Sequence, residues 1–119
     1  MNIEPETQRR VREACSNVIG VKEANVDFGQ VSRDLAVCGR DWKVFSGIET
    51  LCFPMLALGG AGHVSATGNV APREVAALYD LTVPGRRDEA RDTHFPLLDP
   101  NAVLFLETNT GPAKFRLGA

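Results

Sequence analysis

The chain has 119 residues, of which 44% are hydrophobic and 24% charged, and its net charge is −2. This length and composition suit one globular domain. Thirteen basic side chains against fifteen acidic ones leave no surplus positive charge, and no basic run interleaved with aromatics occurs, so nucleic acid is not an expected partner.

A membrane span and a metal site are not expected either. The longest weakly polar run, residues 50–61, contains a proline and is well short of the roughly 20 residues that a span needs. The N-terminus lacks the basic-then-apolar order of a secretory signal, so the expected location is the cytoplasm. His63 and His94 are too isolated to suggest metal binding. The cysteines are expected to be reduced and buried: Cys15, Cys38 and Cys52.

Apolar spacing and helix-ending residues predict alternating helices and strands. In chain order these are a helix over 5–15, a strand over 18–22, a helix from 27 or 28 to 37 ended by Gly39, a strand over 42–46, a helix over 49–58 kinked or begun at Pro54, a strand over 62–67 and a helix from Pro72. The remainder is expected to be helical over 88–98 and 101–107, interrupted at Pro96 and Pro100.

This order predicts an α/β fold with a sheet of about three parallel strands, because the strands begin roughly 20 to 25 residues apart, as in repeated βα units. The chain is interpreted as one partial domain over 1–119, with three βα units over 1–80 and a helical segment over 81–119. Such a sheet has two open edges and one uncovered face. A (β/α)8 barrel would close the sheet but takes about 250 residues, so the chain is interpreted as part of a larger domain.

The stretch VIGVKEA, residues 18–24, ends a short β-branched strand on Lys22. In parallel α/β folds the carboxyl ends of the strands are where sites form, which makes Lys22 a candidate functional group. The alternative is a lysine that closes the strand and extends into water. Glu23 is expected to be solvated or to begin the next helix rather than to act as a general base.

Two other features have a structural and a functional interpretation. The glycine-rich run 59–62 could cradle a phosphate, but it ends a predicted helix and opens a strand, which favours helix termination and tight packing. His63 directly precedes Val64, and strand alternation favours a histidine packed against a helix over a proton shuttle.

Four segments together resemble a known family. They are VIGVKEA at 18–24, VFSG at 44–47, PMLALGGAGHVSATGNVAP at 54–72 and LFLETNTGPAK at 104–114. In order and spacing they resemble the second half of the dihydrodipicolinate synthase and N-acetylneuraminate lyase family, which are pyruvate-dependent Schiff-base aldolases on a TIM barrel. The ETNTGPAK segment is closest to the ETNPIPVK type of the dihydrodipicolinate synthases.

The resemblance implies a role for three residues. Lys22 matches the Schiff-base lysine at the end of the sixth barrel strand, while Gly47 after the seventh strand and Val64 in the eighth line the pyruvate pocket. The implied substrates are pyruvate and an aldehyde, the implied covalent link is an imine on Lys22 with no separate cofactor, and the implied assembly is a homo-oligomer.

The Schiff-base reaction requires a primary amine, which the side chain of Lys22 supplies. An amine must be unprotonated to attack the ketone carbon of pyruvate, and apolar walls of the kind that Val18, Val21 and Val64 provide favour the uncharged form. The cationic imine then accepts electrons as a methyl proton leaves, and the enamine attacks the aldehyde. Gly47 would let substrate approach the backbone without a clash.

Two family motifs do not occur in these 119 residues. They are the Gly-Thr-Thr type turn that binds the pyruvate carboxylate and the proton-shuttling tyrosine, both from the first five strands. Tyr79 lies on a helix after the eighth strand and does not match that tyrosine. Met1 is accordingly expected to be an internal or misassigned start.

Whether the chain alone is an enzyme is therefore left open. One interpretation is a dihydrodipicolinate synthase-like aldolase or lyase that lacks the first half of its barrel. Another is a non-catalytic barrel half that acts as an oligomeric or interaction module and buries its open edges. The third is a small phosphate-binding α/β domain.

Overall fold

The computed structural model describes residues 2–106 and 110–118 and divides the chain into two compact units, residues 1–64 and 65–119. Residues 107–109, in the middle of the ETNTGPAK segment, lie outside the described residues. Within the described ranges, no helix is both long enough and apolar enough to cross a membrane.

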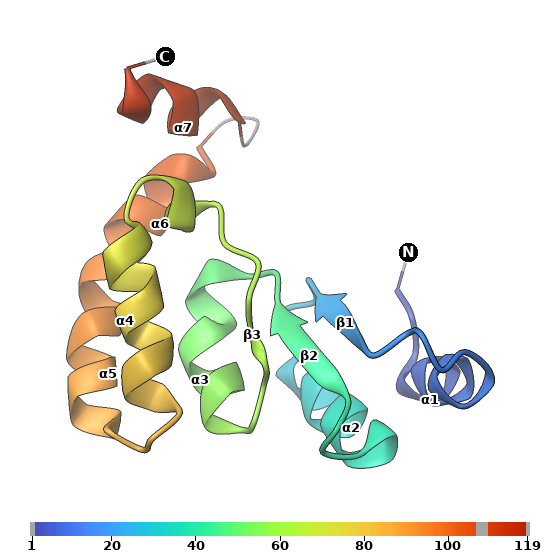
Figure 1. The fold of residues 1–119 in the computed structure, drawn as a ribbon. Coiled ribbons are helices and arrows are strands. Elements are labelled where there is room, and N and C mark those ends of the chain that lie inside the picture. The colour runs from blue at the N-terminus through green and yellow to red at the C-terminus, as the bar shows by residue number, and fades with distance from the viewer. Residues whose placement is uncertain (1, 107–109, 119) are drawn as a thin grey trace. The chain divides into compact units, whose positions relative to one another are not determined.

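The first unit is built around a parallel sheet, drawn in Figure 1 with its strands in chain order. Its elements are α1 (Pro5–Ala14), β1 (Gly20–Glu23), α2 (Phe28–Cys38), β2 (Lys43–Ser46), the 3-10 helix η1 (Glu49–Leu51), α3 (Cys52–Ala57) and β3 (Gly62–His63). Strand β1 pairs with β2, and β2 with β3, all in parallel. The expected α/β class, with three parallel strands, is confirmed.

Helix α2 shows how local sequence sets an element. The Asp27 carboxylate accepts hydrogen bonds from the backbone N–H groups of Gly29 and Gln30, which caps the first turn. Gly39, with φ of 83°, ends the helix in a conformation that a side chain would disfavour. Because a capping side chain fixes one end and a glycine in a positive-φ conformation fixes the other, the prediction of this helix from sequence is accurate to within one residue.

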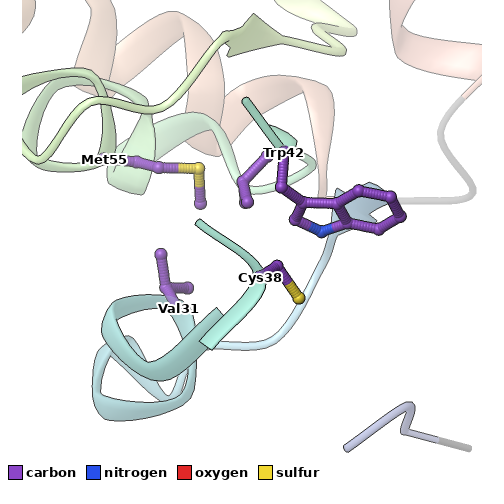
Figure 2. Packing of buried hydrophobic residues seen from close by; sticks show 5 residues of the cluster. Val31, Cys38, Trp42 and Met55 are labelled. Atoms are coloured by element: carbon purple, nitrogen blue, oxygen red, sulfur yellow. The ribbon is translucent and has the colours of Figure 1, made fainter. Parts of the chain in front are cut away.

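The core of the first unit lies on one face of the sheet. Figure 2 shows Val31 on α2 and Met55 on α3 pointing toward one another, with Trp42 and Cys38 beside them. Val44 of β2 completes this cluster and is 0% exposed. Val44 pairs in register with Val21, which packs against the same cluster. The opposite face of the sheet carries side chains that are exposed, Lys22 and Phe45 among them.

The second unit consists of helices. They are the 3-10 helix η2 (Thr67–Asn69), α4 (Pro72–Thr82), α5 (Arg87–His94), the 3-10 helix η3 (Phe95–Leu97), α6 (Leu98–Leu104) and α7 (Thr110–Leu117). A buried hydrogen bond of 2.6 Å from the Thr67 hydroxyl to the Asn101 side-chain oxygen joins η2 to α6. The interpretation of residues 1–119 as one partial domain divided near residue 80 stays a prediction.

Several boundaries differ from those expected from sequence. Strand β3 has two residues instead of six, because the Ser65 hydroxyl accepts the Gly68 N–H at 2.8 Å and turns the chain into η2. Pro54 lies inside the first turn of α3, where its missing N–H is tolerated. Helix α7 was not predicted. The expectation that all three cysteines are buried is wrong for Cys15, which is exposed.

Gly20 permits the close approach of β1 and β2. A Cβ at this position would lie 2.2 Å from the Lys43 carbonyl oxygen and 2.7 Å from the Lys43 Cβ. We predict that Gly20→Ala lowers the free energy of unfolding by about 1–3 kcal/mol, since the crowded atom belongs to the backbone. Denaturant unfolding measures this.

The matched control is Gly111→Ala in α7, where no atom lies within 4 Å of an added Cβ. We expect this variant to be as stable as the parent or up to about 1 kcal/mol more stable. Equal losses in both variants would contradict the described strand packing.

Candidate functional site

Lys22 lies at the carboxyl end of β1, on the open face of the sheet. It pairs in register with Phe45 of β2, which in turn pairs with Gly62 of β3. The Phe45 ring lies over Gly62, where an added Cβ would come within 3.0 Å of it. Lys22 itself is exposed. The open face of the sheet therefore presents the Lys22 amine beside an aromatic ring.

Gly47 lies against Lys22. Its backbone N–H donates a 2.7 Å hydrogen bond to the Glu23 carbonyl, which extends the β1–β2 pairing by one residue. A Cβ on Gly47 would stand 2.6 Å from the Lys22 Cε. The aliphatic part of the Lys22 side chain thus lies over Gly47, and any side chain at position 47 would displace the amine.

Val64 lies at the same end of the sheet but is separated from Lys22 by β2. Its N–H donates to the Ser46 carbonyl at 2.8 Å, which places it directly after β3. Its side chain is 49% exposed. The structure therefore brings Lys22 and Gly47 into contact and leaves Val64 one strand further away.

Among the residues that the structure describes, the apolar enclosure expected around the amine is not present. Val21 packs against the core cluster because neighbouring residues of a strand point to opposite faces, and Val18 packs there too. Lys22 instead borders an open hollow of about 410 Å³ that the N-terminal residues Asn2 and Ile3 help to line. Gly47 and Val64 are not among the residues that line this hollow.

Glu23 is buried at the end of β1, contrary to the expectation that it is solvated or begins the next helix. Its side chain is 6% exposed and lies on the helix side of the sheet, opposite Lys22. The carboxylate accepts hydrogen bonds from the Asn25 N–H at 2.8 Å and from the Gln30 side-chain amide at 3.2 Å. Gln30 also bonds the Asn2 side chain and the Ile3 carbonyl, so Glu23 belongs to a polar layer beneath the open face.

Asp34 on α2 belongs to the same layer and is 0% exposed. Burial raises the pKa of its carboxyl from 3.8 to about 6, the Gln8 side chain lowers it in part, and the Glu23 carboxylate raises it further. The sequence signal for this residue is its spacing: Val31, Asp34 and Cys38 recur every three or four residues and share the buried face of α2.

The His63 imidazole lies on the helix side of the sheet, as expected. Its Nε2 is 3.0 Å from the Glu49 carboxylate of η1, and both side chains are nearly buried. Burial, followed by the Glu49 charge, raises the pKa of the adjacent Cys52 thiol to about 12. This group is a packing cluster behind the sheet and does not reach the open face.

The glycine-rich run 59–62 supports helix termination rather than anion binding. Gly59 has φ of 99° and closes α3. The N–H groups of Gly59, Gly60 and Ala61 all donate to backbone carbonyls, those of Leu56, Met55 and Val44. These donors are therefore not free for a phosphate. Across the described residues, no group of three or more His, Cys, Asp or Glu side chains is placed to hold a metal ion.

Comparison with known proteins decides the family. The family model described as "Dihydrodipicolinate synthetase family" matches residues 1–118. The chain belongs to this family. A 4-hydroxy-tetrahydrodipicolinate synthase from Geotalea uraniireducens is 40% identical over 114 residues, which are 96% of this chain and 39% of that protein.

Solved structures agree with the family assignment. The 4-hydroxy-tetrahydrodipicolinate synthase from Methylacidiphilum fumariolicum SolV is 34% identical with a TM-score of 0.94, over 98% of this chain and 39% of that one. A dihydrodipicolinate synthase from Acinetobacter baumannii, complexed with pyruvate, shares the fold with a TM-score of 0.92 at 23% identity, over 98% of this chain and 40% of that one. The chain thus spans about two fifths of the length of the family members it matches.

Asp34 makes the stability of this family member depend on pH. Because its pKa in the folded state is raised, the protonated form is the stable one, and this stability is present below about pH 4 and lost as the pH rises to about 6. We predict that Asp34→Asn raises the free energy of unfolding at pH 7 to 8 by about 3 kcal/mol, the equivalent of about two pKa units.

Denaturant unfolding across pH 4 to 8 measures the effect, and Asp41→Asn, at an exposed position, is the control. We expect the two variants to differ little at pH 4. If Asp34→Asn loses stability at pH 8, the carboxylate is stabilised by partners that the structure does not show, and the account of this layer is wrong.

Proposed function

We propose that Lys22 is the imine-forming lysine of a pyruvate-dependent aldolase or lyase similar to 4-hydroxy-tetrahydrodipicolinate synthase. The observation that carries the proposal is the contact between Lys22 and Gly47 at the carboxyl ends of two parallel strands. Family membership supports it, and so does the resemblance of the segments around both residues to motifs of that family.

The proposed reaction uses the amine as a nucleophile. The Lys22 nitrogen attacks C2 of pyruvate, and loss of water leaves a protonated imine. The positive nitrogen draws electrons from the methyl carbon as a proton departs, and the resulting enamine attacks the aldehyde carbon. Water then hydrolyses the imine, releasing the product and the amine. Read in reverse, the same steps cleave a carbon–carbon bond.

Gly47 and Val64 are proposed to border the pyruvate. Gly47 leaves open the space next to the Lys22 Cε, and Val64 supplies a small apolar surface at the neighbouring strand end. The carboxylate-binding turn and the tyrosine belong, by resemblance, to the first five strands. For the residues present here we therefore propose imine formation, and full turnover requires those two groups.

The second candidate function is an oligomeric or interaction module. It is favoured by the strand order β1-β2-β3, which leaves β1 and β3 with one unpaired edge each among the described strands. Ile19, just before β1, is 69% exposed. Unpaired edges flanked by apolar side chains are surfaces on which further strands pair. The phosphate-binding alternative has no comparable support, because the backbone N–H groups of Gly59, Gly60 and Ala61 are occupied.

Trapping with borohydride tests the proposal. Incubation with pyruvate and sodium borohydride should add one reduced pyruvate to the protein, and peptide mapping should place it on Lys22. The other lysines, Lys43 and Lys114, are internal controls, and Lys43 is also exposed on this sheet. Lys22→Arg should abolish the adduct, while Lys43→Arg should not. Labelling spread evenly over the three lysines would refute a specific site.

Gly47→Ala tests the contact itself. A methyl group 2.6 Å from the Lys22 Cε forces the end of the lysine to move, so we expect trapping by pyruvate to slow roughly tenfold or more. The free energy of unfolding should fall by only about 1 kcal/mol, because the atom in closest contact belongs to a flexible side chain, while the Ala24 Cβ and the Glu23 carbonyl oxygen, both 3.2 Å away, need to shift only slightly. Gly111→Ala again serves as control. An unchanged trapping rate would show that the amine does not need the space over Gly47.

A further inference from the structure

A row of three residues crosses the open face of the sheet at the level of Lys22. Lys22 of β1 pairs in register with Phe45 of β2, and Phe45 pairs with Gly62 of β3. Paired residues of neighbouring strands point to the same face, and the strands lie about 4.8 Å apart. A group joined to the Lys22 side chain is therefore within reach of the Phe45 ring. The proposed reaction does not use this ring, which is 37% exposed.

The Phe45 ring explains why residue 62 is a glycine. The backbone of Gly62 does not have a positive φ, so its conformation would accept any side chain. A Cβ at this position would lie 3.0 Å from Cε1 and 3.1 Å from Cδ1 of the Phe45 ring. Among the described residues other than its chain neighbours, nothing else lies within 4 Å of that Cβ. The missing side chain therefore serves one contact, which lets the ring lie over β3 and buries Gly62.

The Phe45 ring and the Lys22 side chain occupy separate places on this face. The ring lies over Gly62, whereas the Lys22 Cε lies against Gly47, which follows β2. Each of the two side chains thus fills the space of one that a glycine lacks. A second, shallow hollow of about 380 Å³ is lined by residues 17–22 and by Phe45. In this hollow the lysine and the aromatic ring border the same space.

The chemistry of the ring determines which part of a substrate it can contact. A 2-oxo acid joined to the amine through C2 carries a carboxylate on one side of that carbon and an alkyl group on the other. A carboxylate against an aromatic ring loses hydration and gains no hydrogen bond. An alkyl group gains free energy when the ring covers it, and it gains more with each added methylene.

We propose that Phe45 contacts the alkyl end of a 2-oxo acid held on Lys22, and that Gly62 is a positioning residue that keeps the ring aside. This inference rests on the proposed function of Lys22 as the imine-forming amine. It specifies the ligand class as 2-oxo acids with an unbranched apolar chain. Pyruvate is the shortest of these, and 2-oxobutanoate and 2-oxopentanoate extend the chain into the hollow beside Phe45.

The test is a competition between two 2-oxo acids for the same amine. The protein is incubated with equal concentrations of pyruvate and 2-oxopentanoate and with sodium cyanoborohydride, whose hydride reduces each imine to a stable secondary amine. Mass spectrometry of peptides gives the ratio of the two adducts on Lys22. The same ratio on Lys114, which is exposed on α7, is the reference. Dividing the first ratio by the second gives a selectivity from which the intrinsic reactivity of the two acids cancels.

We expect Lys22 of the parent protein to favour 2-oxopentanoate roughly three- to tenfold, because the ring partly covers the added methylenes. Phe45→Ala should lower this selectivity to about one, and Phe45→Leu, which keeps an apolar side chain, should retain at least half of it. The matched control is Phe95→Ala, which removes an exposed ring from η3 and should leave the selectivity unchanged.

Gly62→Val tests whether the glycine acts through the ring. The larger side chain pushes the Phe45 ring off β3 and over the hollow, so the selectivity for the longer acid should fall to one or below. In the Phe45→Ala protein the same substitution should have no effect, because there is no ring to displace. Circular dichroism checks that each variant is folded. If Gly62→Val does not fold, Gly62→Ala, which displaces the ring less, takes its place.

Equal selectivity in the parent and in Phe45→Ala would overturn the proposal, and so would a Gly62 effect of the same size with and without the ring. In the first case the proposed function of Lys22 still stands, because both acids label it. A parallel competition between ethanal and pentanal separates the opposite case, since aldehydes alkylate any amine under these conditions. If Phe45 controls the aldehyde ratio on Lys22 but no 2-oxo acid labels this lysine, the proposed function fails and the contact of Phe45 with an alkyl group stands.

Discussion

The contact of Gly47 with Lys22 depends on one backbone hydrogen bond, from the Gly47 N–H to the Glu23 carbonyl. This bond continues the parallel register of β1 and β2 past the last paired residues and places a residue without a side chain under the lysine stem. A slip of one residue would turn Lys22 into the core and Val21 out of it. The buried position of Val44, which pairs with Val21, opposes such a slip.

The two faces of the sheet differ in burial and in the side chains that they carry. The helix side buries Val31, Val44 and Met55 and supplies the stability of the first unit. The same side also holds Glu23 and Asp34, which stabilise this face less than apolar residues would. Burying a carboxylate next to Lys22 costs folding free energy. This cost is consistent with a strand end that must be held in one conformation. The open face carries Lys22, Lys43 and the ring of Phe45.

The sequence predicted those features that depend on local chemistry. The bounds of helix α2 were predicted accurately because Asp27 and Gly39 fix its ends. The position of Lys22 at a strand end was predicted because the apolar run before it is typical of a parallel strand. The predicted strand over 62–67 was too long, because the turn at Ser65 replaces strand pairing there. The hydrophobic pattern of the sequence does not reveal this turn. The burial of Glu23 was missed because it depends on Gln30 and Asp34, and only the folded chain brings α2 against β1. The roles of Gly47 and Val64 came from resemblance alone, and these roles and that of Lys22 stay proposals.

The most direct measurement is carbon-13 NMR of pyruvate labelled at C2, mixed with protein in which the lysine side-chain nitrogens are labelled with nitrogen-15. We expect an imine carbon coupled to a lysine nitrogen, observed without any reductant and absent from the Lys22→Arg protein. If C2 stays a ketone or hydrate, or if the imine signal persists in Lys22→Arg, then the amine over Gly47 is not the reactive group.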